Sequence, residues 1–95
     1  METREETATR LAIVAIIVED PGVADEVNRL LHEYREWVVG RMGIPCRERG
    51  VAVISVVLDA PQPTVSALSG KLGMLPGINV KTVYSNVTNK EKSHV

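Results

Sequence analysis

Two short segments of the chain place a cation between glycines, a pattern that suits the binding of a small anion. The segments are Gly40-Arg41-Met42-Gly43 and Gly70-Lys71-Leu72-Gly73. Glycine lets the backbone approach a ligand closely, and a neighbouring cation can hold a carboxylate or phosphate. Arg41 and Lys71 are therefore candidate anion contacts. Alternatively, the glycines of the second segment, which cost a helix about 1 kcal/mol each relative to alanine, indicate tight packing of a helix on a sheet or an early helix end.

An acidic turn is the second candidate ligand contact. Glu19-Asp20-Pro21-Gly22 closes an apolar run, because proline disfavours helix at the residue before it and glycine permits a turn. Its carboxylates could contact an effector, or one of them could simply cap the following helix. The candidate ligand-binding residues are thus Glu19, Asp20, Pro21, Gly22, Arg41 and Lys71.

No residue pattern indicates catalysis or a metal site. His32 and His94 have no partner at the spacing of metal ligands, and Cys46, beside Pro45, is expected to be a small buried filler. The chain has no Ser-His-Asp set in a plausible context, and no glycine-rich phosphate loop follows a strand. We therefore expect no enzyme activity, no metal and no cofactor.

Composition and charge limit the kinds of binding partner and the cellular compartment that we expect for this protein. A formal net charge of −1 gives no field that would attract nucleic acid or an anionic membrane. The central apolar strands lack the aromatic residues that stack RNA bases. A single cysteine, the lack of a secretory signal pattern and a longest apolar run of only residues 11–18 favour a soluble cytoplasmic protein.

An internal repeat predicts the fold. Residues 12–21 and 52–61 are both apolar, β-branched runs closed by an acid and a proline, and each precedes an amphipathic helical stretch and a shorter strand. We expect strands at 10–19, 36–42, 51–59 and 78–84, with helices carrying the apolar stripes of 23–34 and 65–75. Two β-α-β units predict a ferredoxin-like α+β fold, βαββαβ, over residues 10–85. It has a four-stranded antiparallel sheet with two helices on one face, and residues 1–9 and 86–95 are expected to be flexible tails.

Both faces of the two central strands are apolar, although two helices can cover only one of them. Leu11, Ile13 and Ile17 point to one side of the first strand, and Val14 and Ile16 to the other. Such a face would expose apolar surface near the upper limit for a soluble monomer. We therefore expect a homodimer or homotetramer in which helix-free faces or sheet edges meet. The alternative is a tail or bent loop that folds over that face.

The chain resembles two kinds of regulatory domain. Residues 19–23 are similar to the strand-turn-helix element of ACT domains, small amino-acid-sensing modules, although Glu19 stands where that family usually has aspartate. Residues 41–45, 55–61 and 66–77 resemble the iron-only hydrogenase system regulator family, a small ACT-like domain. Its topology is similar to that of the C-terminal domain of nickel-responsive repressors. Nickel sensing is not implied, because residues 37–42 contain no histidine.

The resemblance implies a non-enzymatic regulator of an iron-only hydrogenase system, with no catalytic residues to carry over. Combined with the apolar face, it predicts a homo-oligomer that binds a small-molecule effector at a subunit interface beside residues 19–22. A protein of the hydrogenase system is an expected partner, whereas nucleic acid and membrane are not. The alternative is a structural interaction or assembly module that has no small-molecule ligand.

Overall fold

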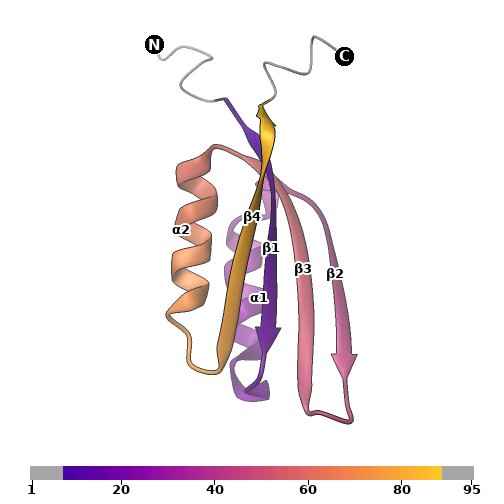
Figure 1. Ribbon diagram of the computed structural model, residues 1–95. Coiled ribbons are helices and arrows are strands. Elements are labelled where there is room, and N and C mark those ends of the chain that lie inside the picture. Colours follow the sequence, from indigo (N-terminus) through magenta and orange to yellow (C-terminus); the bar gives the residue numbers. More distant parts are fainter. Residues whose placement is uncertain (1–7, 89–95) are drawn as a thin grey trace.

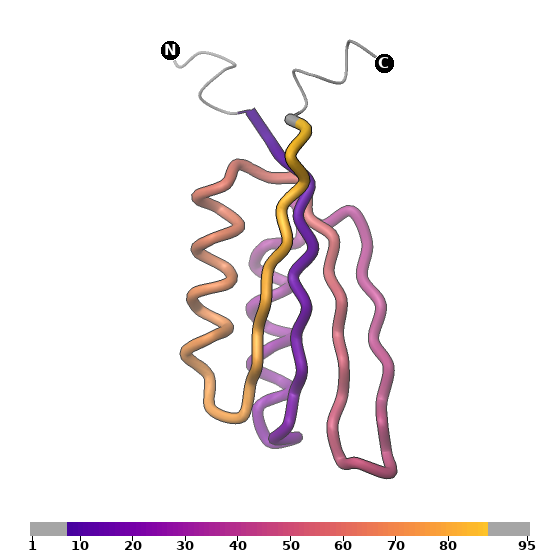
Figure 2. Tube along the Cα trace, in the orientation of Figure 1, coloured from indigo at the N-terminus to yellow at the C-terminus, as the bar shows by residue number. Residues whose placement is uncertain are grey.

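The computed structural model describes residues 8–88, which form one sheet and two α-helices (Figure 1). The element order is β1 (Arg10–Val18), η2 (Pro21–Val23), α1 (Ala24–Glu33), η3 (Arg35–Trp37), β2 (Val38–Cys46), β3 (Val51–Ala60), α2 (Gln62–Gly73) and β4 (Ile78–Thr88). All neighbouring strands are antiparallel, in the order β2-β3-β1-β4 (Figure 2). The expected ferredoxin-like βαββαβ fold is confirmed.

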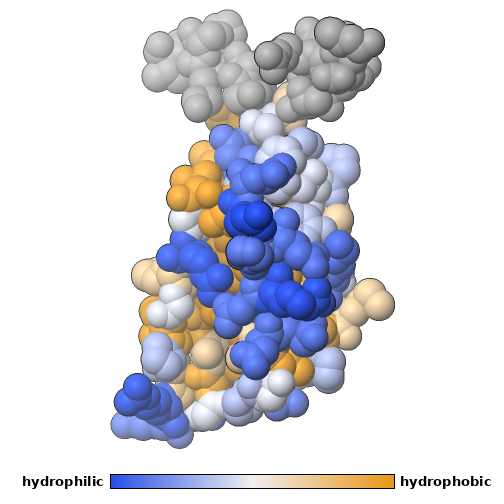
Figure 3. All heavy atoms as spheres, turned by 180° about the vertical axis from the view of Figure 1, so that it is seen from behind, coloured by the Kyte–Doolittle hydropathy of each residue, from blue (hydrophilic) through white to orange (hydrophobic). Residues whose placement is uncertain are grey.

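The hydrophobic core lies between one face of the sheet and the two helices. Alternate residues of β1 and β3 point inward because the side-chain period of a strand is two, and the helices contribute residues at three- and four-residue spacing. Figure 3 views the molecule from the helix side, where polar side chains spread over the middle of the surface. The fully buried core residues include Val14, Ile16, Val27, Val56, Leu58, Val65, Leu68 and Leu72.

The second strand differs from the sequence expectation. It was expected at 36–42, but residues 35–37 form a short 3-10 helix and β2 continues to Cys46. Gly43 and Pro45 do not end it, because β2 is an edge strand and needs a partner on one side only. The irregularity is absorbed instead by a register shift between Val38 and Gly40.

Two smaller expectations also change. Cys46 is half-buried at the end of β2, so it is not the buried filler that was expected. A Cβ atom added at Gly70 or Gly73 would meet nothing within 4 Å, so tight helix-sheet packing is not what selects these glycines. Helix α2 does end at Gly73, in agreement with the alternative of an early helix end.

The last strand extends beyond the expected body of residues 10–85. The fourth strand, expected at 78–84, runs to Thr88, so residues 86–88 belong to the sheet and not to a tail. Of the flexible tails expected at residues 1–9 and 86–95, residues 1–7 and 89–95 lie outside the described residues, and residues 8 and 9 lead into β1 without belonging to a helix or strand. Within residues 8–88, no helix is long and apolar enough to cross a membrane.

Candidate functional site

The turn from β1 to α1 is held by its own hydrogen bonds. Asp20 Oδ1 accepts a hydrogen bond from the Gly22 backbone N–H at 2.9 Å, and the Val23 N–H donates to the Asp20 carbonyl at 3.1 Å. Pro21 suits the first position of η2 because that position needs no N–H donor. Asp20 therefore caps the 3-10 turn, as the alternative interpretation of the acid proposed. The residues from Glu19 to Gly22 are all exposed.

The same turn packs closely against the connection that precedes β4. The Glu19 N–H donates to the Gly77 carbonyl at 2.7 Å. Gly77 has a φ of 73°, and a Cβ atom added there would lie only 2.5 Å from the Asp20 Cβ. The sequence does not indicate this contact, because nothing in the local pattern around Gly77 shows that residue 20 lies against it. Gly77 thus fixes the position of the candidate turn.

The two candidate cations lie on different elements and have different partners. Arg41, on β2, donates from Nη2 to Asn28 Oδ1 of α1 at 2.8 Å. Lys71, on α2, places its Nζ 5.1 Å from the centroid of the Tyr34 ring. Hydrogen bonding with the Tyr34 side chain, the largest cause, raises the pKa of Lys71 above its ordinary value. Lys71 therefore remains positively charged at neutral pH.

The charge of Arg29 is balanced by two neighbouring carboxylates, which makes it a useful comparison for Arg41. Its guanidinium contacts Glu26 at 2.8 Å and Glu33 at 2.6 Å, both on α1. Hydrogen bonding and charge attraction from Glu26 are the largest causes that raise the pKa of Arg29. Within residues 8–88, these two contacts are the only ion pairs, so Arg41 differs from Arg29 in having no carboxylate partner there.

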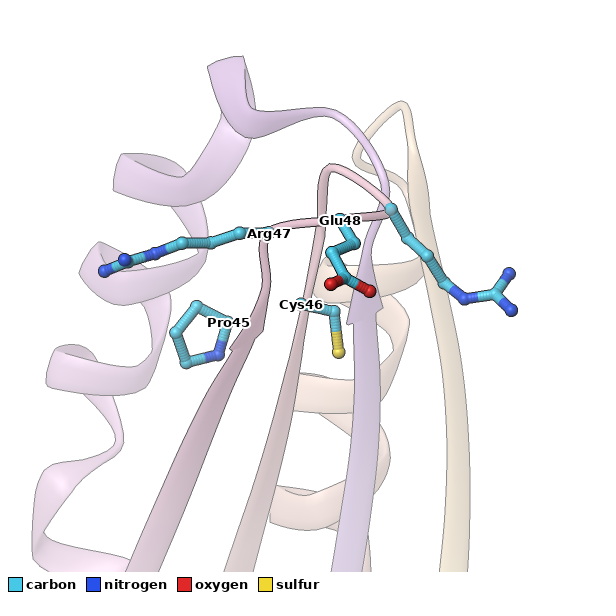
Figure 4. Close-up of a pocket in the computed structure, with 5 residues that line it drawn as sticks. Pro45, Cys46, Arg47 and Glu48 are labelled. Atoms are coloured by element: carbon cyan, nitrogen blue, oxygen red, sulfur yellow. The ribbon is translucent and has the colours of Figure 1, made fainter.

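Cavities lie beside some of the candidate residues. Arg41 lines a cavity of about 300 Å³ between α1 and β2, and Pro21 lines a second one of about 260 Å³ nearer the β2–β3 hairpin. A wider hollow of about 510 Å³ is formed by the hairpin residues 45–49 (Figure 4). The described residues contain no group of three or more His, Cys, Asp or Glu side chains that could hold a metal ion.

The helix-free face of the sheet exposes apolar side chains of β1, β2 and β4; Figure 1 looks onto it. It consists of three rows of residues that lie opposite one another across the four strands. From β2 to β4 the rows are Gly40, Val57, Ile13, Val83; Met42, Ser55, Ala15, Lys81; and Ile44, Val53, Ile17, Asn79. Exposed fractions reach 45% at Ile13, 59% at Met42 and 65% at Val83. In these three rows the only charged residue is Lys81, on the β4 edge; the next row of the same face places Asp59 of β3 opposite the exposed Leu11 of β1.

The chain is similar to proteins of one named family. A family model described as "TM1266-like: Iron-only hydrogenase system regulator, putative" matches residues 10–82. The solved structure of TM1266 from Thermotoga maritima is 42% identical, with a TM-score of 0.77; the match covers 80% of this chain and 96% of that one. The comparison with curated proteins found no match.

A more distant likeness concerns the fold alone. A formyltetrahydrofolate deformylase from Pseudomonas putida is 18% identical, with a TM-score of 0.60. The match covers 81% of this chain but only 30% of the deformylase chain. A module of this shape therefore also occurs as one part of a larger protein.

Proposed function

The chain belongs to the TM1266-like family of iron-only hydrogenase system regulators, and from this premise we propose that it is a non-enzymatic, cytoplasmic regulatory domain that works as a homo-oligomer. The regulated system is the one that the family description names. A small effector that fits only the assembled form would shift the balance between assembly states, because a ligand favours whichever state binds it more tightly.

The helix-free face is the observation that carries the oligomer. Strands about 4.8 Å apart and nine residues long, at about 3.3 Å per residue, give four strands a face of roughly 570 Å². Two such faces would bury about 1,100 Å² together, just above the roughly 1,000 Å² expected of a specific interface. Only part of this area is apolar, because the face also carries Ser55, Lys81 and Asn79. At about 25 cal/mol per Å² of apolar area, covering that part favours association by several kcal/mol before the costs of ordering are subtracted.

We therefore propose that two sheets pack face to face, about 10 Å apart, as in a β-sandwich. If folding and pairing are linked, thermal stability must depend on protein concentration. Raising the concentration about a hundredfold should raise the melting temperature by several degrees, because mass action then adds about 2.7 kcal/mol of stability. Calorimetry over that range checks this, and a melting temperature that does not change with concentration would contradict it.

The effector site that we propose from the sequence lies at the turn, with Glu19, Asp20, Pro21 and Gly22 as contacts and Arg41 or Lys71 as anion contacts. Its test uses the double variant Glu19→Gln, Asp20→Asn, because asparagine keeps an oxygen acceptor for the Gly22 N–H while both charges disappear. Native mass spectrometry of protein from the native cell should show a bound small molecule on the wild type and less of it on the variant. Equal retention by both proteins would contradict the turn as the site.

The second candidate function is an assembly module that docks another protein on the same apolar face. The face itself favours it, because apolar surface of this size suits a hetero-partner as well as a second copy. The two functions differ in one respect: a module of this kind stays monomeric alone and buries the face only in a stoichiometric complex. A concentration-dependent melting temperature therefore favours the regulatory homo-oligomer.

A further inference from the structure

The helix side of β2 is uncovered. Arg41, Gly43 and Pro45 alternate on this side of the strand, opposite the inward-facing residues Val56, Ile54 and Ala52 of β3. The inward residues of β1 are buried, but these three residues of β2 are all exposed. The space beside them is bounded by α1 and contains the two cavities of about 300 and 260 Å³. We call this space the α1–β2 groove.

One end of the α1–β2 groove is basic. His32 and Arg35 line it from the end of α1 and the start of η3, and Arg41 lines it from β2. Arg35 Nη1 donates to the His32 carbonyl at 3.0 Å, and Arg41 Nη2 donates to Asn28 Oδ1 at 2.8 Å. A guanidinium has five donors, so both arginines keep donors for a ligand. No carboxylate lines this cavity, so the basic end suits an oxyanion.

The other end of the α1–β2 groove is apolar. Pro21, Ala24, Pro45 and Val51 are among the residues that line its cavity. Arg47 stands at the rim and extends toward the side on which α1 lies (Figure 4). This end therefore offers hydrocarbon contacts with a further cation at its border.

The two cavities are separate and share no lining residue, but both lie between α1 and β2. Ala24, Asn28 and Leu31 recur at three- and four-residue spacing on α1 and so share one face of the helix. On β2, Gly43 lies between Arg41 and Pro45, and a Cβ atom added there would meet nothing within 4 Å. From Arg41 to Pro45 the strand rises about 13 Å. A small extended molecule is therefore long enough to reach from one cavity to the other across Gly43, which has no side chain.

We propose that the α1–β2 groove binds a small amphipathic anion, whose carboxylate or phosphate contacts Arg41 and Arg35 and whose short apolar body lies over Gly43 toward Pro45. Charge complementarity favours this direction, because two arginines with free donors line the basic end, whereas Arg47 stands alone at the rim of the apolar end. The groove includes Pro21 and Arg41, so the inference rests on part of the proposed effector site. It does not depend on the proposed homo-oligomer, because the groove lies on the opposite side of the sheet from the helix-free face.

The test is a titration of isotope-labelled protein with octanoate, followed by the backbone amide signals in nuclear magnetic resonance spectra. We expect shifts at residues around Asn28, Arg41 and Gly43, with a dissociation constant of about 1 mM, which suits a ligand of this size. Octyl phosphate is a parallel probe that distinguishes a phosphate head group from a carboxylate, and inorganic phosphate shows how much the head group binds without the chain. Binding of either octyl anion supports the proposal. Octanol binding as tightly as octanoate would overturn it, because the charged end would then contribute nothing.

Three variants make the test specific. Arg41→Gln should weaken octanoate binding about tenfold or more, since it removes a charge-assisted contact. Gly43→Val should fill the middle of the α1–β2 groove, so octanoate should bind only as weakly as acetate, which lacks the apolar chain. Valine suits a strand and should preserve the fold. Arg49→Gln, which removes a hairpin charge outside both cavities, is the matched control and should bind like the wild type. Unchanged binding by Arg41→Gln and Gly43→Val, or shifts confined to the helix-free face, would contradict the proposal.

Discussion

Gly77→Ala is expected to lower the free energy of unfolding by roughly 2–5 kcal/mol, a large part of the stability of a domain of this size. Two costs add together. The φ of 73° is unfavourable for any residue with a Cβ, and the new Cβ would lie 2.5 Å from the Asp20 Cβ. The β1–α1 turn would have to move, and with it the hydrogen bond from the Glu19 N–H. Urea denaturation followed by circular dichroism measures the loss.

Gly50 provides the matched control. Its φ is 69°, but a Cβ added there meets nothing within 4 Å. Gly50→Ala should therefore cost only about 1–2 kcal/mol for the backbone conformation. Asparagine tolerates positive φ, so the pair Gly77→Asn and Gly50→Asn isolates the steric cost even if Gly77→Ala does not fold. Equal losses in the two asparagine variants would show that residue 77 does not lie against the turn.

Ile13→Glu is expected to make the protein monomeric and to raise the dissociation constant of the homo-oligomer at least a hundredfold, which is about 2.7 kcal/mol. Ile13 lies in the middle of the helix-free face, between Val57 and Val83 on its neighbouring strands. In an interface formed by the same face of both copies, each chain would bury its glutamate without a cation in that row. Analytical ultracentrifugation of both proteins provides the comparison.

The variant should fold normally, because Ile13 is 45% exposed in the single chain and glutamate there stays in contact with water. Ala67→Glu is the control for added charge: it introduces the same side chain at an exposed position of α2, on the other side of the sheet. This control should assemble like the wild type. If Ile13→Glu also assembles like the wild type, the helix-free face is not the interface.

The strand order and core could be predicted because the pattern is strong where packing is dense. Residues 10–18 and 51–60 carry long β-branched runs in two copies, and their alternation leaves little choice of register once one face is buried. The second strand was predicted poorly because it is exposed on both faces. Burial therefore does not impose a hydrophobic pattern on it, and Gly40, Gly43 and Pro45 resemble a strand end.

The site was less predictable than the fold. The sequence suggested Arg41 and Lys71 as equivalent cations, but one lies on an edge strand beside Asn28 and the other on α2 beside Tyr34. The surroundings of Arg41 and Lys71 depend on which face of the strand or helix is covered by other elements. The spacing of residues along the chain does not show which face is covered. The α1–β2 groove was not predicted for the same reason. It exists because the helix side of β2 is left uncovered, and this becomes visible only once the helices are in place.

The mass of the wild-type protein in solution tests the central claim most directly. Light scattering across a dilution series should give at least twice the 10.4 kDa mass of the chain at high concentration, with dissociation on dilution. The pairing of helix-free faces predicts this result, because a face of roughly 570 Å² with this many exposed apolar side chains is near the upper limit for a soluble monomer. A mass of 10.4 kDa at every concentration would contradict the homo-oligomeric regulator.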